Sequence, residues 1–81
     1  MMMQAGYIMK RNGEYLTAVR ETDQGILYPI FGIYKYDAAR VPTERHARHI
    51  IRGLYREGES WQIYRFHPLS GDERLMTCTR G

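Results

Sequence analysis

The segment from Pro42 to Gly58 reads PTERHARHIIRGLYREG, and its periodicity decides the fold. With about 3.6 residues per turn, one side of a helix through this segment carries only apolar positions. These positions are Ala47, Ile50, Ile51 and Leu54. The opposite side carries basic residues, namely Arg45, Arg48, His49, Arg52 and Arg56. We therefore predict an amphipathic helix whose apolar side packs on a sheet built by the rest of the chain.

Both ends of the predicted helix carry recognisable signals. Thr43 is a suitable N-cap, because its hydroxyl can accept a hydrogen bond from a free N–H of the first turn. Glu44 suits the positive end of the helix dipole, and Arg56 suits the negative end. Gly58 fits the left-handed position that follows the last turn.

Before the helix, residues 7–20 (YIMKRNGEYLTAVR) have the pattern of a β-hairpin. Asn12-Gly13 is a strong signal for a two-residue type I′ turn, in which both residues take positive φ. Such a turn places four apolar side chains on one face: Tyr7, Met9, Leu16 and Ala18. We take this face as the core face, although the opposite face also carries apolar groups and a slip of one residue would exchange the two.

The remaining segments predict further strands. Residues 26–36 (ILYPIFGIYKY) are rich in β-forming residues, and the interruptions at Pro29 and Gly32 predict two short strand pieces or one broken edge strand. Residues 60–67 predict an interior strand, and residues 74–79 predict a final short strand. The expected fold is α+β, in the order β-β-β-α-β-β, with a mainly antiparallel sheet and one helix across one of its faces.

Length and composition point to one small domain. The 81 residues suffice for a single domain, 1–81, in which we expect residues 1–5 to be disordered. The single cysteine, Cys78, excludes an internal disulfide and fits a reducing cytoplasm. No apolar run is long enough to span a bilayer, and the start of the chain lacks the pattern of a secretory signal. We therefore expect a cytoplasmic protein with no membrane contact.

The basic side of the helix is the best clue to function. Its guanidinium groups suit phosphates or the carboxylates of an acidic partner, and the net charge of +3 favours such a partner. We expect these arginines to lack neighbouring acids, since acidic residues at i±4 are mostly missing. The alternative is a solvated helix face that keeps a small protein soluble.

Tyrosines are the second candidate for a contact surface. The chain has 7 of them, and a small domain cannot bury them all. Exposed tyrosine beside arginine is typical of protein hot spots and of base-stacking surfaces. The candidates for such a surface are Tyr28, Tyr34 and Tyr36.

Catalysis and metal binding find little support in the sequence. His46 and His49 lie three residues apart, but a structural zinc site wants about four ligands. Cys78 lies in a predicted strand, where a small buried residue is the usual role. The chain has no glycine-rich phosphate loop. We predict no catalytic residue, no metal site and no cofactor.

Residues 6–66 resemble a loose family of very small proteins from bacteriophages and integrated mobile elements. The resemblance is carried by YIMKRNGEYL at 7–16, by the alanines before an extended stretch at 37–41, by the helix, and by the strand after it. The chain departs from the family in its longer, more aromatic segment 26–36 and in a tail after Pro68. The family's motifs mark a fold more than an activity.

The resemblance implies an accessory protein, in the cytoplasm of a bacterial host, that either disables a host defence or regulates transcription. We expect a non-enzymatic protein that binds and inhibits a host protein or ribonucleoprotein complex, with an anti-CRISPR-type inhibitor as the narrowest version. The alternative is a small nucleic-acid-binding regulator that uses the arginine side of the helix. No oligomeric state is predicted.

Overall fold

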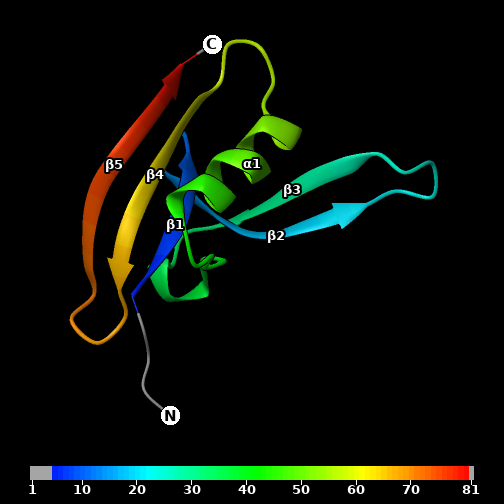
Figure 1. Cartoon of the computed structure of the whole chain (residues 1–81). Helices are drawn as coiled ribbons and strands as arrows, with labels where there is room; N and C mark the ends of the chain where they lie inside the picture. The colour runs from blue at the N-terminus through cyan, green and yellow to red at the C-terminus, as the bar shows by residue number, and fades with distance from the viewer. Residues whose placement is uncertain (1–4, 81) are drawn as a thin grey trace.

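The computed structural model describes residues 5–80, with only the backbone for residue 80. Five strands, one α-helix and a short 3-10 helix follow one another along the chain (Figure 1). They are β1 (Gly6–Arg11), β2 (Glu14–Glu21), β3 (Leu27–Gly32), the 3-10 helix Lys35–Asp37, α1 (Glu44–Leu54), β4 (Ser60–His67) and β5 (Asp72–Arg80). The expected disorder of residues 1–5 concerns mainly residues 1–4, which lie outside the described residues.

The strands form one antiparallel sheet in the order β3-β2-β1-β4-β5. The predicted α+β class and the order β-β-β-α-β-β are confirmed. The first strand, β1, lies at the centre of the sheet, and β4 lies in its interior between β1 and β5. Among the described residues, no helix is of the length and apolarity that a membrane crossing requires.

The predicted Asn12-Gly13 turn joins β1 and β2. Both residues take positive φ, 51° at Asn12 and 85° at Gly13, as a type I′ turn requires. Arg11 pairs with Glu14 across the turn, so the predicted register is confirmed at this end of the hairpin. Most L-residues avoid positive φ, whereas asparagine and glycine tolerate it, so Asn-Gly is a specific signal for this turn.

Helix α1 packs on β1, β4 and β3. Thr43 caps it as predicted, because its Oγ1 accepts a hydrogen bond 3.0 Å long from the His46 backbone N–H. The core on this side of the sheet contains Ala47, Ile51 and Leu54 from the helix. They pack with Met9, Leu16, Val41, Trp61 and Ile63.

The C-terminal end of the helix differs from the prediction. The helix ends at Leu54, and Tyr55 leaves it in an extended conformation. Gly58 has a φ of 87°, but it belongs to the turn before β4 and does not follow the last helical turn. Glycine at positive φ is found both at helix ends and in tight turns. The prediction that Gly58 ends the helix is wrong, because this glycine lies in a tight turn.

The sheet is buried on both faces. The face away from α1 has its own cluster, in which Ile8, Tyr15 and Phe66 pack against Ala38. The connection after the 3-10 helix therefore covers this second face. The choice of the Met9 and Leu16 face for the helix is confirmed, but the opposite face is also core.

An irregularity in β2 moves Ala18 out of the predicted face. Leu16 pairs with Phe31, but Ala18 pairs with Ile30, the next residue along β3. Side chains alternate along a strand, so Phe31 and Ile30 point to opposite faces, and their partners do as well. The prediction that Ala18 shares a face with Leu16 is wrong for this reason.

Strand β3 is an edge strand, as one of the two interpretations of residues 26–36 predicted. Pro29 is tolerated there because an edge strand has one side with no ladder to complete. Together β2 and β3 extend well beyond the helix as a two-stranded arm (Figure 1). The arm is the part of the fold that places most of the candidate tyrosine segment away from the core.

Candidate functional site

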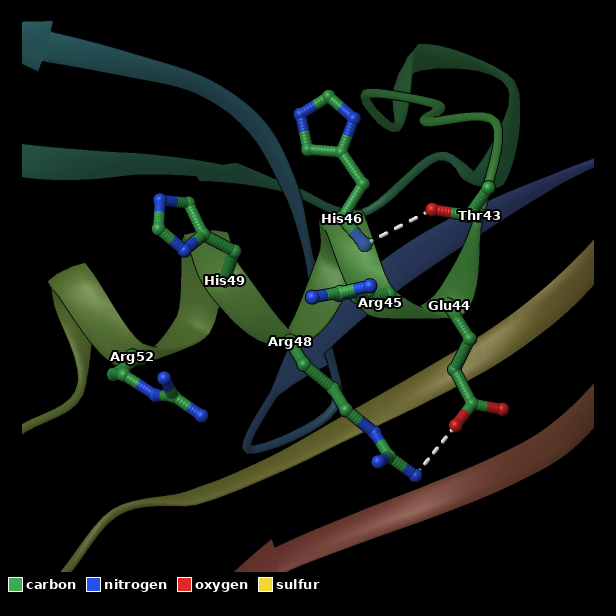
Figure 2. Close-up of a pocket in the computed structure, with 7 residues that line it drawn as sticks. All are labelled: Thr43, Glu44, Arg45, His46, Arg48, His49 and Arg52. Atoms are coloured by element: carbon green, nitrogen blue, oxygen red, sulfur yellow. Dashed lines mark hydrogen bonds and ion pairs between the residues drawn. The ribbon is translucent and has the colours of Figure 1, made fainter.

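The outer side of α1 carries a basic surface, which we call the basic helix face: Arg45, His46, Arg48, His49 and Arg52. Together with Thr43 and Glu44 these side chains line a shallow hollow (Figure 2). All of the lining comes from this one helix and its cap, so the hollow is an open surface with no opposing wall. Such a surface suits contact with a large partner better than enclosure of a small substrate.

Arg48 is neutralised locally, which contradicts the sequence prediction. Its Nη2 lies 2.6 Å from Glu44 Oε2, one turn earlier on the helix (Figure 2). The same nitrogen donates a hydrogen bond 3.3 Å long to Thr77 Oγ1, and Thr77 donates one of 3.1 Å to Glu44. Glu44 lies four residues before Arg48, and side chains at this spacing are neighbours on a helix surface. Arg48 is thus held against β5.

Arg56 does not belong to the basic helix face. The helix ends at Leu54, so Arg56 lies in the following loop, where its backbone N–H donates to Glu59. The prediction that it continues the line of arginines is therefore wrong. Among the described residues, the arginines of the face without a carboxylate partner are Arg45 and Arg52, with His46 and His49 beside them.

The structure separates the candidate tyrosines from the basic helix face. Tyr28, Tyr34 and Tyr36 are exposed, at 44%, 67% and 60%. The Tyr36 ring packs edge-on against Phe66, whose cluster lies on the face of the sheet away from α1. Tyr28 is two residues from Ile30, so strand alternation places it on that same face. Tyrosines and arginines do not form one mixed surface.

Aliphatic side chains accompany the exposed tyrosines. The arm and the connection after β3 expose a set that we call the apolar strip. It consists of Val19, Ile26, Leu27, Tyr28, Ile30, Ile33, Tyr34 and Tyr36. Strand alternation places Val19 and Leu27 on the opposite face of the arm from Tyr28 and Ile30, so the strip covers both faces of the arm. The exposed fractions run from 37% at Ile30 to 73% at Ile33. The aliphatic members were missed as contact residues, although the unusual length of the apolar segment 26–36 was a signal for them.

A second polar cluster lies on the sheet face away from α1. Lys10 Nζ lies 4.4 Å from the centre of the Tyr15 ring, 4.7 Å from that of Tyr64, and 3.7 Å from Glu73 Oε2. The Tyr15 hydroxyl donates a hydrogen bond to Glu73 Oε1. Burial and the Glu73 carboxylate raise the pKa of Tyr15 far above its ordinary value, so its phenol stays protonated. The cluster therefore holds β5 to the centre of the sheet and offers no nucleophile.

Glu59 forms a hydrogen-bonded hub where the chain enters β4. Its carboxylate accepts from the backbone N–H of Arg56 at 2.7 Å, from Arg11 Nη1 at 2.8 Å and from Trp61 Nε1 at 3.1 Å. Burial alone would raise the pKa of Glu59, but these donors and the Arg11 charge outweigh it and lower the pKa. The hub ties the loop after α1 to the core tryptophan.

The lowered pKa of Glu59 makes stability depend on pH. Below the ordinary pKa of 4.5 the unfolded state binds a proton at Glu59 before the folded state does, so acid favours unfolding. We expect the free energy of unfolding to fall as the pH drops through this region and onward to the lowered value. Urea unfolding between about pH 6 and about pH 3 measures this fall, and Glu59→Gln should remove part of it. An equally steep fall in the Gln variant would contradict the assignment.

Within the described part of the chain, no group of three or more His, Cys, Asp or Glu residues is arranged to hold a metal ion. Cys78 is exposed on β5, so the prediction that it is a buried core residue is wrong. It was expected to be buried because free cysteines usually are, but β5 is an edge strand whose side chains are half-covered or exposed.

Comparison with protein-family models, with curated proteins and with solved structures finds no match to this chain. The resemblance to small phage and mobile-element proteins therefore stays a prediction.

Proposed function

We propose that this protein acts by binding, and that the apolar strip is its main contact with a host protein or nucleoprotein complex, which it inhibits. The observation that carries the proposal is the exposure of eight large apolar side chains on both faces of one projecting arm and on its connection. A monomeric soluble protein rarely leaves so many together in water, and where it does they usually mark an interaction site.

The chemistry of the strip suits a protein partner. Aromatic and aliphatic side chains supply the apolar centre of most stable interfaces, and tyrosine is frequent among their hot spots. The arm projects from the body of the molecule and can enter a groove of a larger assembly (Figure 1). Inhibition then needs only steric blockage of the surface to which the arm binds.

The proposed action is non-enzymatic and takes place in the cytoplasm of a bacterial host. The polar clusters of the described residues have structural partners: Lys10 pairs with Glu73, and Arg11 pairs with Glu59. Within this proposal, an anti-CRISPR-type inhibitor carried by a phage or mobile element is the narrowest version. It is suggested by the resemblance of residues 6–66 and by the binding surface together.

A nucleic-acid-binding regulator is the second candidate. The exposed guanidiniums of Arg45 and Arg52, with His46 and His49 between and beside them, favour it. This face has fewer free cations than the sequence indicated, because Arg48 is paired with Glu44 and Arg56 lies off the helix. We therefore rank it below the protein-binding function.

Two variants distinguish these functions in a pull-down from bacterial lysate, with and without nuclease. The first, Ile33→Asp with Tyr34→Asp, charges the apolar strip at two highly exposed positions that the fold does not need. We expect it to melt like the wild type and to lose the captured partner, with at least about a tenfold loss in affinity for that partner once purified. The second, Arg45→Glu with Arg52→Glu, reverses the free cations of the basic helix face.

The two variants serve as controls for each other, since both add negative charge. Loss of capture only in the helix variant, together with loss of capture after nuclease, would replace the inhibitor with the nucleic-acid regulator. A partner retained by both variants would overturn both functions. Arg48 is left unchanged in this design because its pairing with Glu44 makes it structural as well.

A further inference from the structure

A groove runs between α1 and β5, on the side of the sheet that the helix covers. It is lined by Arg48, Ile51, Arg52, Tyr55, Thr77 and Thr79. It exists because α1 packs on β1, β4 and β3 and leaves β5 beyond its edge. The helix forms one wall of the groove and the inner face of β5 forms the other.

Strand β5 offers a free backbone edge beside this groove. It pairs with β4 on one side, and within residues 5–80 no strand pairs with its other side. Natural edge strands are commonly protected by proline or by charged side chains. The other edge strand, β3, has Pro29 near its middle, whereas residues 75–79 of β5 (LMTCT) have neither a proline nor a charge. The edge beside the groove therefore lacks proline and charge over residues 75–79, and its pairing is regular from Thr77 onward, after a register shift between Leu75 and Thr77.

The groove carries one unpaired cation, Arg52, and is partly preorganised. Its other arginine, Arg48, is paired with Glu44, while Ile51 and Tyr55 supply apolar surface. Arg48 is already fixed by Glu44 and Thr77, so it loses little freedom when it binds a ligand. Arg52 is exposed and free to turn toward an occupant.

We propose that the groove between α1 and β5 binds an extended acidic peptide segment of a partner protein, which adds to the sheet as a strand beside β5. Backbone hydrogen bonds to β5 would supply affinity, and a carboxylate facing the exposed guanidinium of Arg52 would supply specificity. This site is separate from the apolar strip and does not depend on the function proposed for it.

The charges argue against a second copy of this chain as the occupant. Two β5 strands paired about a two-fold axis would place the two α1 helices on the same side of the joined sheet. Arg48 and Arg52 of one copy would then face the same residues of the other, and like charges across an interface disfavour it. The net charge of +3 adds to this repulsion.

The test uses a fluorescein-labelled, capped peptide of alternating glutamate and valine, eight residues long, in anisotropy titrations with the wild-type protein. We expect saturable binding. A peptide with lysine in place of glutamate tests charge, and an acidic peptide N-methylated at every residue tests the backbone hydrogen bonds. Each should bind at least about tenfold more weakly than the acidic peptide.

Arg52→Glu and Arg45→Glu form a matched pair of protein variants. Both reverse one exposed charge on the same helix, but only Arg52 lines the groove. We expect Arg52→Glu to weaken peptide binding by about tenfold. Arg45→Glu should change it by less than about threefold, because exposed charges outside the groove are screened by salt.

Three results would overturn the proposal. One is equal weakening by both variants, which would indicate general attraction to a basic surface. Another is undiminished binding of the N-methylated peptide, which would exclude strand addition. The third is a stable wild-type dimer in sedimentation that the acidic peptide fails to dissociate, since a second copy would then occupy the edge.

Discussion

Ile51→Asp should unfold the protein. Ile51 is 3% exposed in the centre of the helix-side core, where it packs with Met9, Trp61 and the other buried members of this cluster. An aspartate there must either stay ionised without a partner or take up a proton, and both cost several kcal/mol. A domain of this size is stable by only about 5–10 kcal/mol. Circular dichroism should show loss of the cooperative thermal transition.

His49→Asp is the matched control for this variant. It introduces the same side chain two residues away, at an exposed position of the same helix. The lower helix propensity of aspartate applies to both variants, so any difference between them comes from burial. A cooperative melt of Ile51→Asp close to that of His49→Asp would contradict the assigned helix packing.

Trp61→Ala should have the next largest effect on stability, about 3–5 kcal/mol. The Trp61 side chain is fully buried and joins several parts of the fold. Its ring packs against Phe31 with centroids 5.7 Å apart, and the Arg11 guanidinium lies 5.9 Å from the ring centre. Removing the ring leaves a large cavity between α1 and the sheet. Urea unfolding followed by far-UV circular dichroism measures the loss.

Trp61→Phe separates the packing of the ring from its hydrogen bond. This variant keeps most of the buried ring but removes the Nε1 donor to Glu59. Glu59 retains Arg11 and the Arg56 backbone N–H, so we expect a loss of only about 1–2 kcal/mol. A loss equal to that of Trp61→Ala would mean that the hydrogen-bonded hub contributes more than the packing.

The helix and the first hairpin could be predicted because their signals are local. The apolar stripe from Ala47 to Leu54 has a single consistent period, and Thr43 caps it by a contact within one turn. Asn12-Gly13 allows few alternatives to the observed turn. Element order and fold class follow from such local patterns, so they too were within reach of the sequence.

The composition of the candidate site depends on contacts that the local pattern does not encode. The irregularity after Leu16 shifts the alternation of side chains along β2, and no residue type at that point in the sequence predicts it. Thr77 lies 33 residues from Glu44 and 29 from Arg48, so the contacts that fix this pair depend on the register of β5. The separation of the tyrosines from the basic helix face likewise follows from strand register and from the path of the connection to α1.

The central position of β1 sets the order in which the chain can fold. Its hairpin with β2 is local and forms early, but its other neighbour is β4, which begins about fifty residues later. Bringing β1 and β4 together closes this long loop and costs conformational entropy before any hydrogen bond between the two strands has formed. The pairing of β1 with β4 should therefore limit the folding rate. During synthesis, β1, β2 and β3 leave the ribosome before β4 does. The edge of β1 that will pair with β4 is then free, and the apolar side chains of Ile8 and Met9 are not yet covered. The nascent chain is then most prone to misassociation in the interval before β4 arrives.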